Sequence, residues 1–327
     1  KNIPEESVRM MEMQAGDIDL MEAPLIYADE LSESGTVKLY TGASDRQMQL
    51  CWVVNNPDPG YRPYFTDKRV RQAVNYALDK QELVDVVLGG WGWVSVGLVR
   101  YGYAGYAPYL AKYYHNTTKA QELLAEAGYP AGFECKLMCE SREYRPYAED
   151  AAVLIKDQLA DVGIEVTIEL VDKTTNKARR FAQQYELSMQ GWRGSGLADT
   201  PHATIAGRYH SRFCGPGAGL WNYENINDSR IDYMIDRLVE TPLEDVETWT
   251  VFSDEIQRIA IEEAYDCPLW DRAFVHASSL AVQGYDVDPS MGSPLWAPNI
   301  GVEVWLNRTE GTQSTSSVMG GLFEFED

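Results

Sequence analysis

The segment YFTDKRVRQAVNYALDKQELVDVVL, residues 64–88, decides the fold because it specifies two consecutive helices. Its apolar residues recur at the spacing of one helical face: Val70, Ala73, Val74, Ala77 and Leu78. Asp79 then offers an N-cap for a second helix, with Glu82 three residues later as its capping-box partner. Gly89 and Gly90 follow as a C-terminal stop.

The totals indicate a soluble globular protein that is large enough for two domains, or for one large domain with an embedded lobe. The 327 residues are 45% apolar and 24% charged, which is ordinary for this class. The 28 basic and 50 acidic residues give a net charge of −22. This argues against nucleic acid or an anionic membrane as partner, since phosphate binding needs a basic face. We interpret the acidity as an aid to solubility.

No run of 18 apolar residues occurs, so we predict no transmembrane helix. Lys1 is followed by a polar segment and not by the apolar core of a signal peptide. We therefore expect a mature form, a fragment or a cytoplasmic chain, and composition does not choose among the three.

The cysteines and histidines indicate neither a disulfide framework nor a metal site. Five cysteines are an odd number, and Cys135 and Cys139 would lie about 13 Å apart on a strand, too far for a disulfide. We expect the cysteines to be small buried apolar residues. CxxC, HxxxH and HExxH spacings are absent, and residues 215–219, GPGAG, lack the spacing of a dinucleotide fingerprint. We expect no metal and no cofactor.

Periodicity predicts an α/β protein. Residues 48–54 form an apolar run typical of a buried strand, and residues 55–60, rich in proline and glycine, mark a first domain boundary. Residues 133–139, 147–162 and 164–170 read as strand, helix and strand, a right-handed βαβ unit. Other expected elements are helices 5–15, 118–127 (with a Thr118/Gln121 capping box), 176–184, 228–238 and 253–264, strands 18–20, 187–192 and 268–277, an irregular segment 90–114, and a frayed tail at 311–320.

The segment 64–88 and six others, in the same order, resemble the extracytoplasmic solute-binding proteins of ABC importers, peptide/nickel type, which include oligopeptide- and dipeptide-binding proteins. The six are QAGDIDLMEAP (14–24), NTTKAQELLAEAGYPAG (116–132), LIKDQLADVGIEVTIELV (154–171), GWRGSGLADTP (191–201), WNYENINDSRIDYMID (221–236) and PLW (268–270). Together they span nearly the whole chain, from about Gln14 to Trp305.

The resemblance implies a two-lobed, periplasmic-binding-protein-like fold of type II, with crossing strands between two α/β lobes. Family members are longer, so lobe one would be partial and lobe two nearly complete. Residues 1–60 and 278–308 would belong to lobe one, 61–277 to lobe two, and 309–327 to a flexible tail. Half of the binding cleft would then be absent or altered.

The resemblance also implies capture of a solute by lobe closure, without catalysis, and delivery to the transmembrane subunits of an ABC permease. A monomer without cofactor would act outside the cytoplasm, in the periplasm or lipid-anchored at the cell surface, with its signal segment not in this chain.

By resemblance, Trp192, Arg193 and Ser195 lie in the ligand loop that follows strand 187–192. Peptide-binding members carry there an aspartate that pairs with the ligand's α-ammonium, whereas this chain has Ser195 and its next acid is Asp199. Either Asp199 substitutes, or the ligand has no free amine, because an unpaired buried ammonium costs several kcal/mol. Peptide is the favoured ligand class, and an oligosaccharide is the alternative.

Further candidate ligand contacts each carry a structural alternative. Trp91 and Trp93 lie among glycines, which would let a ligand approach closely, or they pack under a loop. Asn222 and Tyr223 match a cleft segment of the family. On the returning strand, Trp270 is a candidate and Arg272 could pair with a ligand carboxylate or form a structural ion pair.

Two other function classes stay open. An enzyme that acts on glycosides through paired carboxylates is a distant alternative, which turnover of a bound oligosaccharide would reveal. A lobe that has lost its cleft and senses a partner is the other, which a ligand screen without hits would favour.

Overall fold

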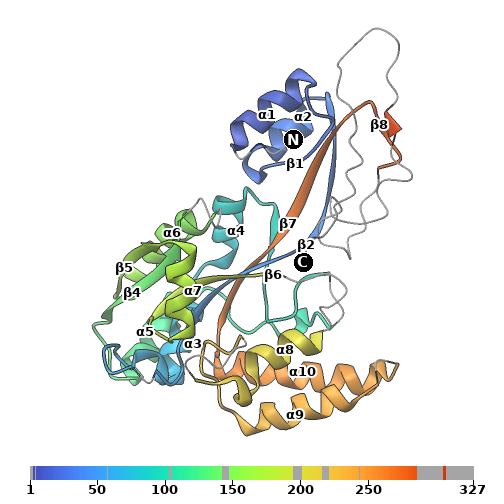
Figure 1. The fold of residues 1–327 in the computed structure, drawn as a ribbon. Coiled ribbons are helices and arrows are strands. Elements are labelled where there is room, and N and C mark those ends of the chain that lie inside the picture. The colour runs from blue at the N-terminus through green and yellow to red at the C-terminus, as the bar shows by residue number, and fades with distance from the viewer. Residues whose placement is uncertain are drawn as a thin grey trace. The chain divides into compact units, whose positions relative to one another are not determined.

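The computed structural model describes residues 3, 5–56, 58–102, 105–141, 147–193, 201–215, 221–242, 244–285 and 305–306. The chain divides into two compact units, Lys1–Ser44 with Ala273–Asp327 and Asp45–Arg272. Both divisions fall inside long strands, β2 (Val37–Trp52) and β7 (Cys267–Ser279), which are neighbours in the sheet (Figure 1). The limits differ from those expected at 60 and 277. On the first strand, residues 46–52 pair with β6 in the larger unit.

The smaller unit is built on a short antiparallel pair. Strand β1 (Leu20–Glu22) pairs with β7, with Leu20 opposite Ser278. Helix α1 (Glu6–Ala15) ends, as predicted, at Gly16, whose φ of 80° suits glycine. The remaining elements are η1 (Leu25–Tyr27), α2 (Ala28–Glu33), β8 (Val282–Gln283) and β9 (Trp305–Leu306). The core of this unit includes Met10, Met13, Leu25 and Leu31.

The larger unit carries the strand order β7-β2-β6-β4-β5, with β3 on the other side of β7. The strands are β3 (Gly92–Val94), β4 (Phe133–Glu140), β5 (Ile164–Val171) and β6 (Leu187–Arg193). The helices are η2 (Tyr64–Thr66), α3 (Lys68–Ala77), α4 (Lys80–Leu88), η3 (Pro108–Leu110), α5 (Thr117–Glu126), α6 (Ala148–Ala160), α7 (Lys173–Phe181), α8 (Pro201–Tyr209), η5 (Ser211–Phe213), α9 (Ser229–Glu240) and α10 (Val246–Glu263).

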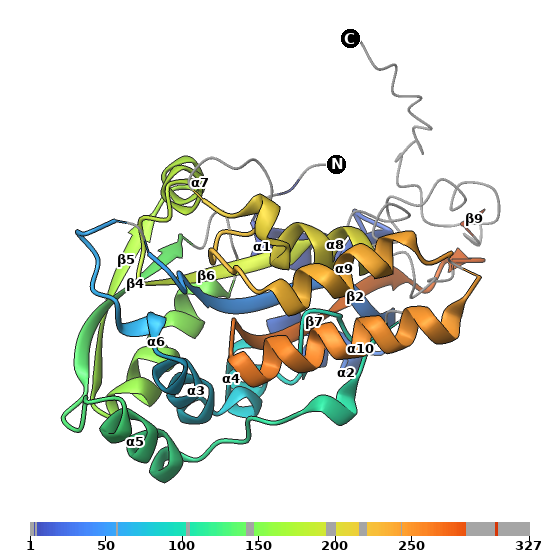
Figure 2. The ribbon, with the colours of Figure 1, turned by 90° about the horizontal axis from the view of Figure 1, so that it is seen from below.

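The predicted βαβ unit is confirmed. β4 and β5 pair in parallel from Phe133 opposite Ile164 to Glu140 opposite Val171, and α6 connects them. Helices α6 and α7 cover opposite faces of these strands, while α8, α9 and α10 lie side by side (Figures 1 and 2). Helices therefore cover both faces of β4 and β5, although alternate residues of these strands, among them Glu134, Lys136 and Glu165, stay exposed.

The two helices predicted from residues 64–88 are confirmed, and the five apolar residues that define the first face, from Val70 to Leu78, are at most 1% exposed. Asp79 caps α4 by accepting from the backbone N–H of Gln81 and Glu82. The capping box itself does not close, because Glu82 accepts instead from Gln158 Nε2 at 2.6 Å. Gln158 Oε1 takes the role expected of Glu82 and accepts from the N–H of Asp79 at 3.0 Å.

Helix α3 also binds the far end of α10, which the sequence did not predict. Arg71 is 3% exposed and donates to the backbone oxygens of Phe65, Thr66, Glu263 and Ala264. Two of these acceptors lie at the C-terminal end of α10, where unpaired carbonyls favour a cation. One guanidinium thus holds backbone groups that lie 192 and 193 positions away in the sequence.

Several element limits differ from the sequence predictions. β2 begins at Val37 and not near residue 48. The cap of α5 is Asn116, not Thr118, because its side chain accepts from the N–H of Lys119. α7 begins at Lys173, since Asp172 caps it. Residues 92–94, expected to be irregular, form β3, and helices α2 and α8 were not predicted. The segment 311–320 lies outside the described residues.

Four of the five cysteines are buried as expected, and Cys214 is half-buried. All five are thiols, and Cys51, Cys135, Cys139 and Cys267 are buried. Burial raises the pKa of Cys135 to about 12, so this thiol stays neutral and unreactive at pH 7. Within the described residues, no helix combines the length and apolar character needed to cross a membrane.

Gly92 marks a close approach of β3 to β7. A Cβ on Gly92 would lie 2.9 Å from the backbone oxygen of Asp271 and 2.8 Å from Cδ1 of Leu88, so Gly92→Ala should destabilise the fold by about 1–3 kcal/mol. Gly97 is the matched control, because its Cβ would meet nothing nearer than 3.5 Å. Urea unfolding of both variants measures the difference, and equal stabilities would contradict the assignment.

Candidate functional site

The candidate site is the part of the larger unit where β2 and β7 leave it. The backbone of Trp192 pairs with Gln47 of β2, and that of Arg193 with Arg46. On the other side of β7, Trp93 of β3 lies opposite Asp271. Strand pairing therefore places Trp93, Asp271, Gln47 and Trp192 in one row across strands β3, β7, β2 and β6.

Gln47 lies at the centre of this row and forms hydrogen bonds to three neighbouring groups. Its Nε2 lies 3.0 Å from Oδ1 of Asp271, 2.7 Å from Oγ of Ser95 and 2.9 Å from the backbone oxygen of Gly97. Gln47 and Asp271 are each 2% exposed. Because buried polar groups need partners, these bonds fix β2 against β7 and against the segment that follows β3.

Asp271 is a buried acid in this network. Burial raises its pKa to about 6, although the backbone N–H of Tyr101 and the side chain of Gln47 oppose the rise by donating to the carboxylate. The carboxyl group therefore titrates near the pH range in which many proteins work. Its position beside β2 links that titration to the strand that crosses between the units.

Three aromatic rings lie next to Asp271. Trp93 stacks on Tyr101 with ring centroids 4.2 Å apart, and Tyr101 meets Tyr106 edge-on at 5.6 Å. Trp93 is half-buried and Tyr101 is 36% exposed, so the stack presents aromatic surface to solvent. Flat aromatic surface of this kind suits apolar or ring-shaped groups of a solute.

A second part of the polar network runs along β2 into α8. Gln49 donates to Gln47 Oε1, and Arg208 of α8 donates to Gln49 Oε1. Arg208 Nη2 also bonds Oε1 of Glu224 at 2.6 Å and Oδ2 of Asp266 at 3.2 Å. Gln49, Arg208 and Glu224 are 0% exposed. We call Gln47, Gln49, Arg208, Glu224, Asp266 and Asp271 the buried polar layer.

Within this layer the guanidinium of Arg208 forms ion pairs with two acids, Glu224 and Asp266. Burial raises the pKa of Glu224, and the guanidinium of Arg208 opposes that rise. Desolvation of such an ion pair is expensive, so the layer stays intact only while each member keeps its partner. Sequence reasoning missed the layer, although Gln47 and Gln49 stand two residues apart, the spacing of one strand face, at the start of the apolar run 48–54.

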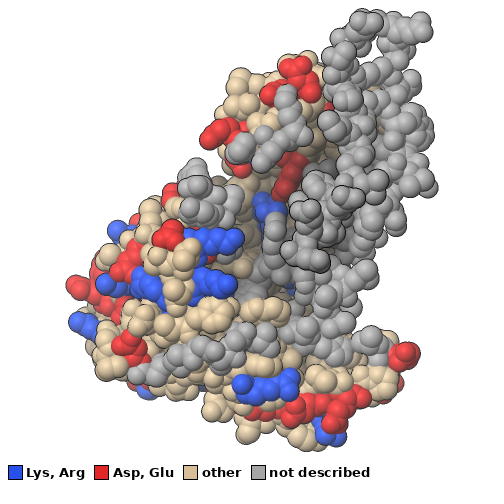
Figure 3. Space-filling view, in the orientation of Figure 1, with Lys and Arg blue, Asp and Glu red and all other residues tan. Residues whose placement is uncertain are grey.

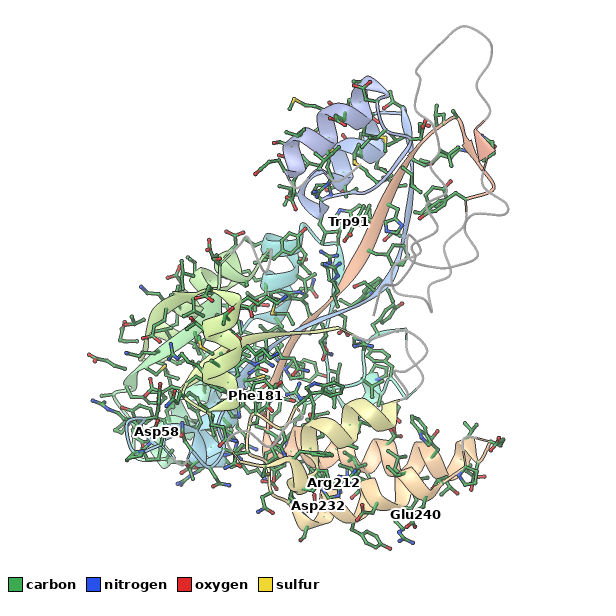
Figure 4. All side chains as sticks on the ribbon, in the orientation of Figure 1. Asp58, Trp91, Phe181, Arg212, Asp232 and Glu240 are labelled. Atoms are coloured by element: carbon green, nitrogen blue, oxygen red, sulfur yellow. The ribbon has the colours of Figure 1, made fainter. Side chains whose placement is uncertain are left out.

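Asn222 bonds the protein's own backbone, and Tyr223 packs against another ring of the fold. The Nδ2 of Asn222 donates to the backbone oxygens of His210 and Ile226, and its Oδ1 accepts from the N–H of Ile226. The ring of Tyr223 meets Phe181, labelled in Figure 4, at 5.3 Å. Both residues are at most 8% exposed, so they organise the turn before α9.

The other candidates lie in different surroundings. Trp270 is 2% exposed and opposite Val94, whereas Arg272 is half-buried, opposite Gly92, with its Cζ 5.8 Å from the ring of Tyr147. Trp91 is half-buried just before β3. Of the ligand loop, the structure describes only the backbone of Trp192 and Arg193, and Ser195 and Asp199 lie outside the described residues.

The described residues contain no cluster of three or more His, Cys, Asp or Glu side chains that could hold a metal ion. His210 lies 3.4 Å from Asp232 and 3.3 Å from Asp236, but its Nδ1 accepts from the backbone N–H of Arg212. This imidazole therefore acts within the fold of the α8–α9 connection.

Comparison with known proteins gives a consistent match. The family model described as "Bacterial extracellular solute-binding proteins, family 5 Middle" matches residues 1–211. The oligopeptide-binding protein AppA of Bacillus subtilis is 27% identical over 185 residues, which are 53% of this chain and 33% of AppA. Heme-binding protein A of Haemophilus influenzae is 26% identical over 245 residues, 72% of this chain and 42% of that protein.

A solved structure of similar fold is the periplasmic binding protein DppA from Helicobacter pylori, in complex with the peptide STSA. It has a TM-score of 0.76 and 23% identity, and the match covers 94% of this chain and 56% of DppA. The chain thus spans less than half the length of the two curated relatives and little more than half of the solved structure. The two-lobed binding-protein fold expected from the sequence is confirmed.

Removal of Arg208 should leave Glu224 and Asp266 without their cation. We expect Arg208→Met to lower the free energy of unfolding by about 3–5 kcal/mol at pH 7, measured by urea unfolding. The control is Arg237→Met on α9, whose ion pair with Glu240 is exposed, with an expected loss below about 1 kcal/mol. Because burial raises the pKa of Glu224, the deficit of Arg208→Met should shrink as the pH is lowered and the abandoned carboxylate takes up a proton; a deficit independent of pH would contradict this.

The raised pKa of Asp271 predicts a pH dependence of stability. Because the folded pKa of about 6 lies above the reference value of 3.8, the acid favours folding most below pH 3.8, and this contribution is lost as the pH rises through 6. The difference corresponds to about 3 kcal/mol. Asp271→Asn should remove this component, so that its stability relative to the parent rises between pH 4 and pH 7. Parallel stability curves for the two proteins would refute it.

Proposed function

The chain belongs to the bacterial extracellular solute-binding proteins of family 5, and from that premise we propose that it captures a peptide-like solute for an ABC importer. The match to the family model over residues 1–211 is the observation that carries the proposal. Capture would occur by closure of two lobes, followed by delivery to a membrane permease. The protein would act outside the cytoplasm as a monomer.

The covalent path of the chain supports a closing mechanism. The chain passes between its two compact units inside β2 and again inside β7. Inside each unit, β2 and β7 can keep the register of their strand pairing. Between the units the two neighbouring strands can bend together, which is the behaviour of a hinge. A solute would favour the closed state by its differential affinity for that state.

The buried polar layer determines which part of β2 can bend. Gln47 and Gln49 are bonded to Asp271 and Arg208, and residues 46–52 pair with β6. Breaking such buried bonds leaves polar groups unsatisfied at about 1–3 kcal/mol each. Residues 46–52 would therefore move with the larger unit, and bending would be confined to the part of β2 that precedes Arg46.

For the solute contacts, we propose the loop that begins at Trp192 and Arg193 and includes Ser195 and Asp199. Trp93 is the best supported aromatic contact, because its ring is half-buried in a stack with exposed Tyr101. Trp91 and Arg272, also half-buried, are further candidates from the same part of the larger unit. Asn222, Tyr223 and Trp270 would act through the positions of their neighbours, since they are buried in the described structure.

Peptide is the ligand class that the curated relatives favour. AppA of Bacillus subtilis and a dipeptide-binding protein of Escherichia coli carry peptides in their names, as 27% and 26% identical relatives. The relatives are named for what they bind, which supports a binding protein and not an enzyme. An oligosaccharide is the second candidate, favoured by Ser195 in place of an acid and by the stack of Trp93 on Tyr101.

The role of Asp199 distinguishes the two ligand classes. If Asp199 pairs with the α-ammonium of a peptide, Asp199→Ala should weaken peptide binding about 100-fold and leave oligosaccharide binding unchanged. Calorimetry of the 327-residue chain with mixed di- to pentapeptides and with maltose- and cellulose-derived oligosaccharides measures both.

The matched control is Asp157→Ala, which removes an exposed acid from α6. Native mass spectrometry of the gently purified chain gives a second readout, because a co-purified peptide would appear as an adduct. If the parent binds no peptide, and oligosaccharide binding survives in Asp199→Ala, the ligand class is oligosaccharide and not peptide. Turnover of the oligosaccharide would overturn the proposal of a binding protein.

A further inference from the structure

Helices α9 and α10 and the short helix η3 enclose a surface groove that the solute site does not include. Its volume is about 380 Å³, and it is lined by Leu110, Met234, Val251, Phe252, Asp254, Glu255 and Arg258. We call these residues the α9–α10 groove. All of them lie within the larger unit.

The floor of the groove is apolar and accessible. Leu110, Met234 and Phe252 are half-buried, and Val251 is 61% exposed. Tyr109 and Tyr233, on the neighbouring turns of η3 and α9, are exposed as well. Large apolar side chains grouped on an otherwise polar helix pair mark an interaction surface more often than an isolated exposed residue does.

The rim of the groove is acidic. Arg258 is already held by two carboxylates, with its Nε 2.9 Å from Glu255 and its Nη1 2.6 Å from Glu262. Asp254 accepts a hydrogen bond from the hydroxyl of Tyr109, and this bond leaves its negative charge in place. The rim therefore carries more negative than positive charge.

The same sign extends over the whole helix pair. Residues 229–263 contain ten acidic residues and three arginines. Figure 3 shows acidic side chains over α9 and α10, and Figure 4 places Asp232 and Glu240 towards the two ends of α9. A partner for this surface must offer positive charge around an apolar centre.

This requirement excludes two occupants by charge. A second copy of the chain would bring a net charge of −22 and the same acidic helix pair. An anionic membrane would likewise be repelled. A small apolar molecule would not use the acidic rim.

We propose that the α9–α10 groove docks an amphipathic helix of a partner protein, with apolar residues at i, i+3, i+4 and i+7 between lysines or arginines. The apolar side chains enter between η3 and α10, and the cations face Asp254, Glu255 and the acids of α9. Docking does not depend on which solute the protein captures.

The test uses a labelled synthetic peptide of about 18 residues, made of leucine and lysine with that apolar spacing. A peptide of the same composition in scrambled order measures charge attraction alone. Fluorescence anisotropy with the full chain at near-physiological salt should show saturable binding that the scrambled peptide does not displace.

A matched pair of variants locates the binding. Val251→Asp places a charge in the groove, and Val153→Asp places the same charge on α6 at a valine of similar exposure, 53% against 61%. Val251→Asp should weaken peptide binding at least about tenfold, and Val153→Asp should leave it within about twofold. Equal effects of the two variants, or displacement by the scrambled peptide, would overturn the proposal.

Sedimentation tests the remaining alternative, that a second copy of the chain occupies the groove. The parent chain should sediment as a monomer with and without the peptide. A dimer that Val251→Asp dissociates would assign the groove to a second copy and would also overturn the proposal. Each readout is independent of solute binding, so failure here leaves the proposed transport function untouched.

Discussion

The bond network from Asp271 through Gln47 and Gln49 to Arg208 is the constraint on which the larger unit depends. It joins β7, β2 and α8 through side chains that are at most 2% exposed. An apolar layer in this place would tolerate a shift of register, whereas a buried amide or guanidinium loses its partner when a strand slides. The polar layer therefore holds β2 to one position at the point where it leaves the unit. Closure of a binding protein needs such a fixed end as much as it needs a flexible one.

Much of the architecture could be predicted from the sequence because the signals are local. The apolar face of residues 68–78, the aspartate that caps α4 and the glycine that ends α1 act within one or two helical turns. The alternation in β4 and β5, with a helix between them, likewise predicts a parallel pair. Errors arose where another residue took the expected role. Asn116 and not Thr118 caps α5, and Gln158, 79 positions from Asp79, replaced Glu82 in the capping box.

The candidate site was less accessible to sequence reasoning, because its geometry depends on partners distant in the chain. Asp271 faces Gln47 from 224 positions away, and nothing local distinguishes it from an acid on the surface. Trp93 and Trp270 look alike as tryptophans in a sequence, yet the first is half-buried in a stack and the second is buried in a strand. Asn222 carries a polar tip suited to a ligand, but the turn before α9 uses both ends of its amide. Only the folded surroundings of each residue separate these cases.

The large negative charge acts differently in two places, and ionic strength separates them. In the buried polar layer, Glu224 and Asp266 surround Arg208 away from solvent, so added salt screens them little. On α9 and α10 the acids face water, where the Debye length at physiological salt is about 8 Å and attraction for a cationic partner falls as salt rises. In the first group burial raises the pKa of Glu224, whereas the second group responds to salt through screening. One acidic composition thus supports a rigid strand inside the protein and a charge-selective surface outside it.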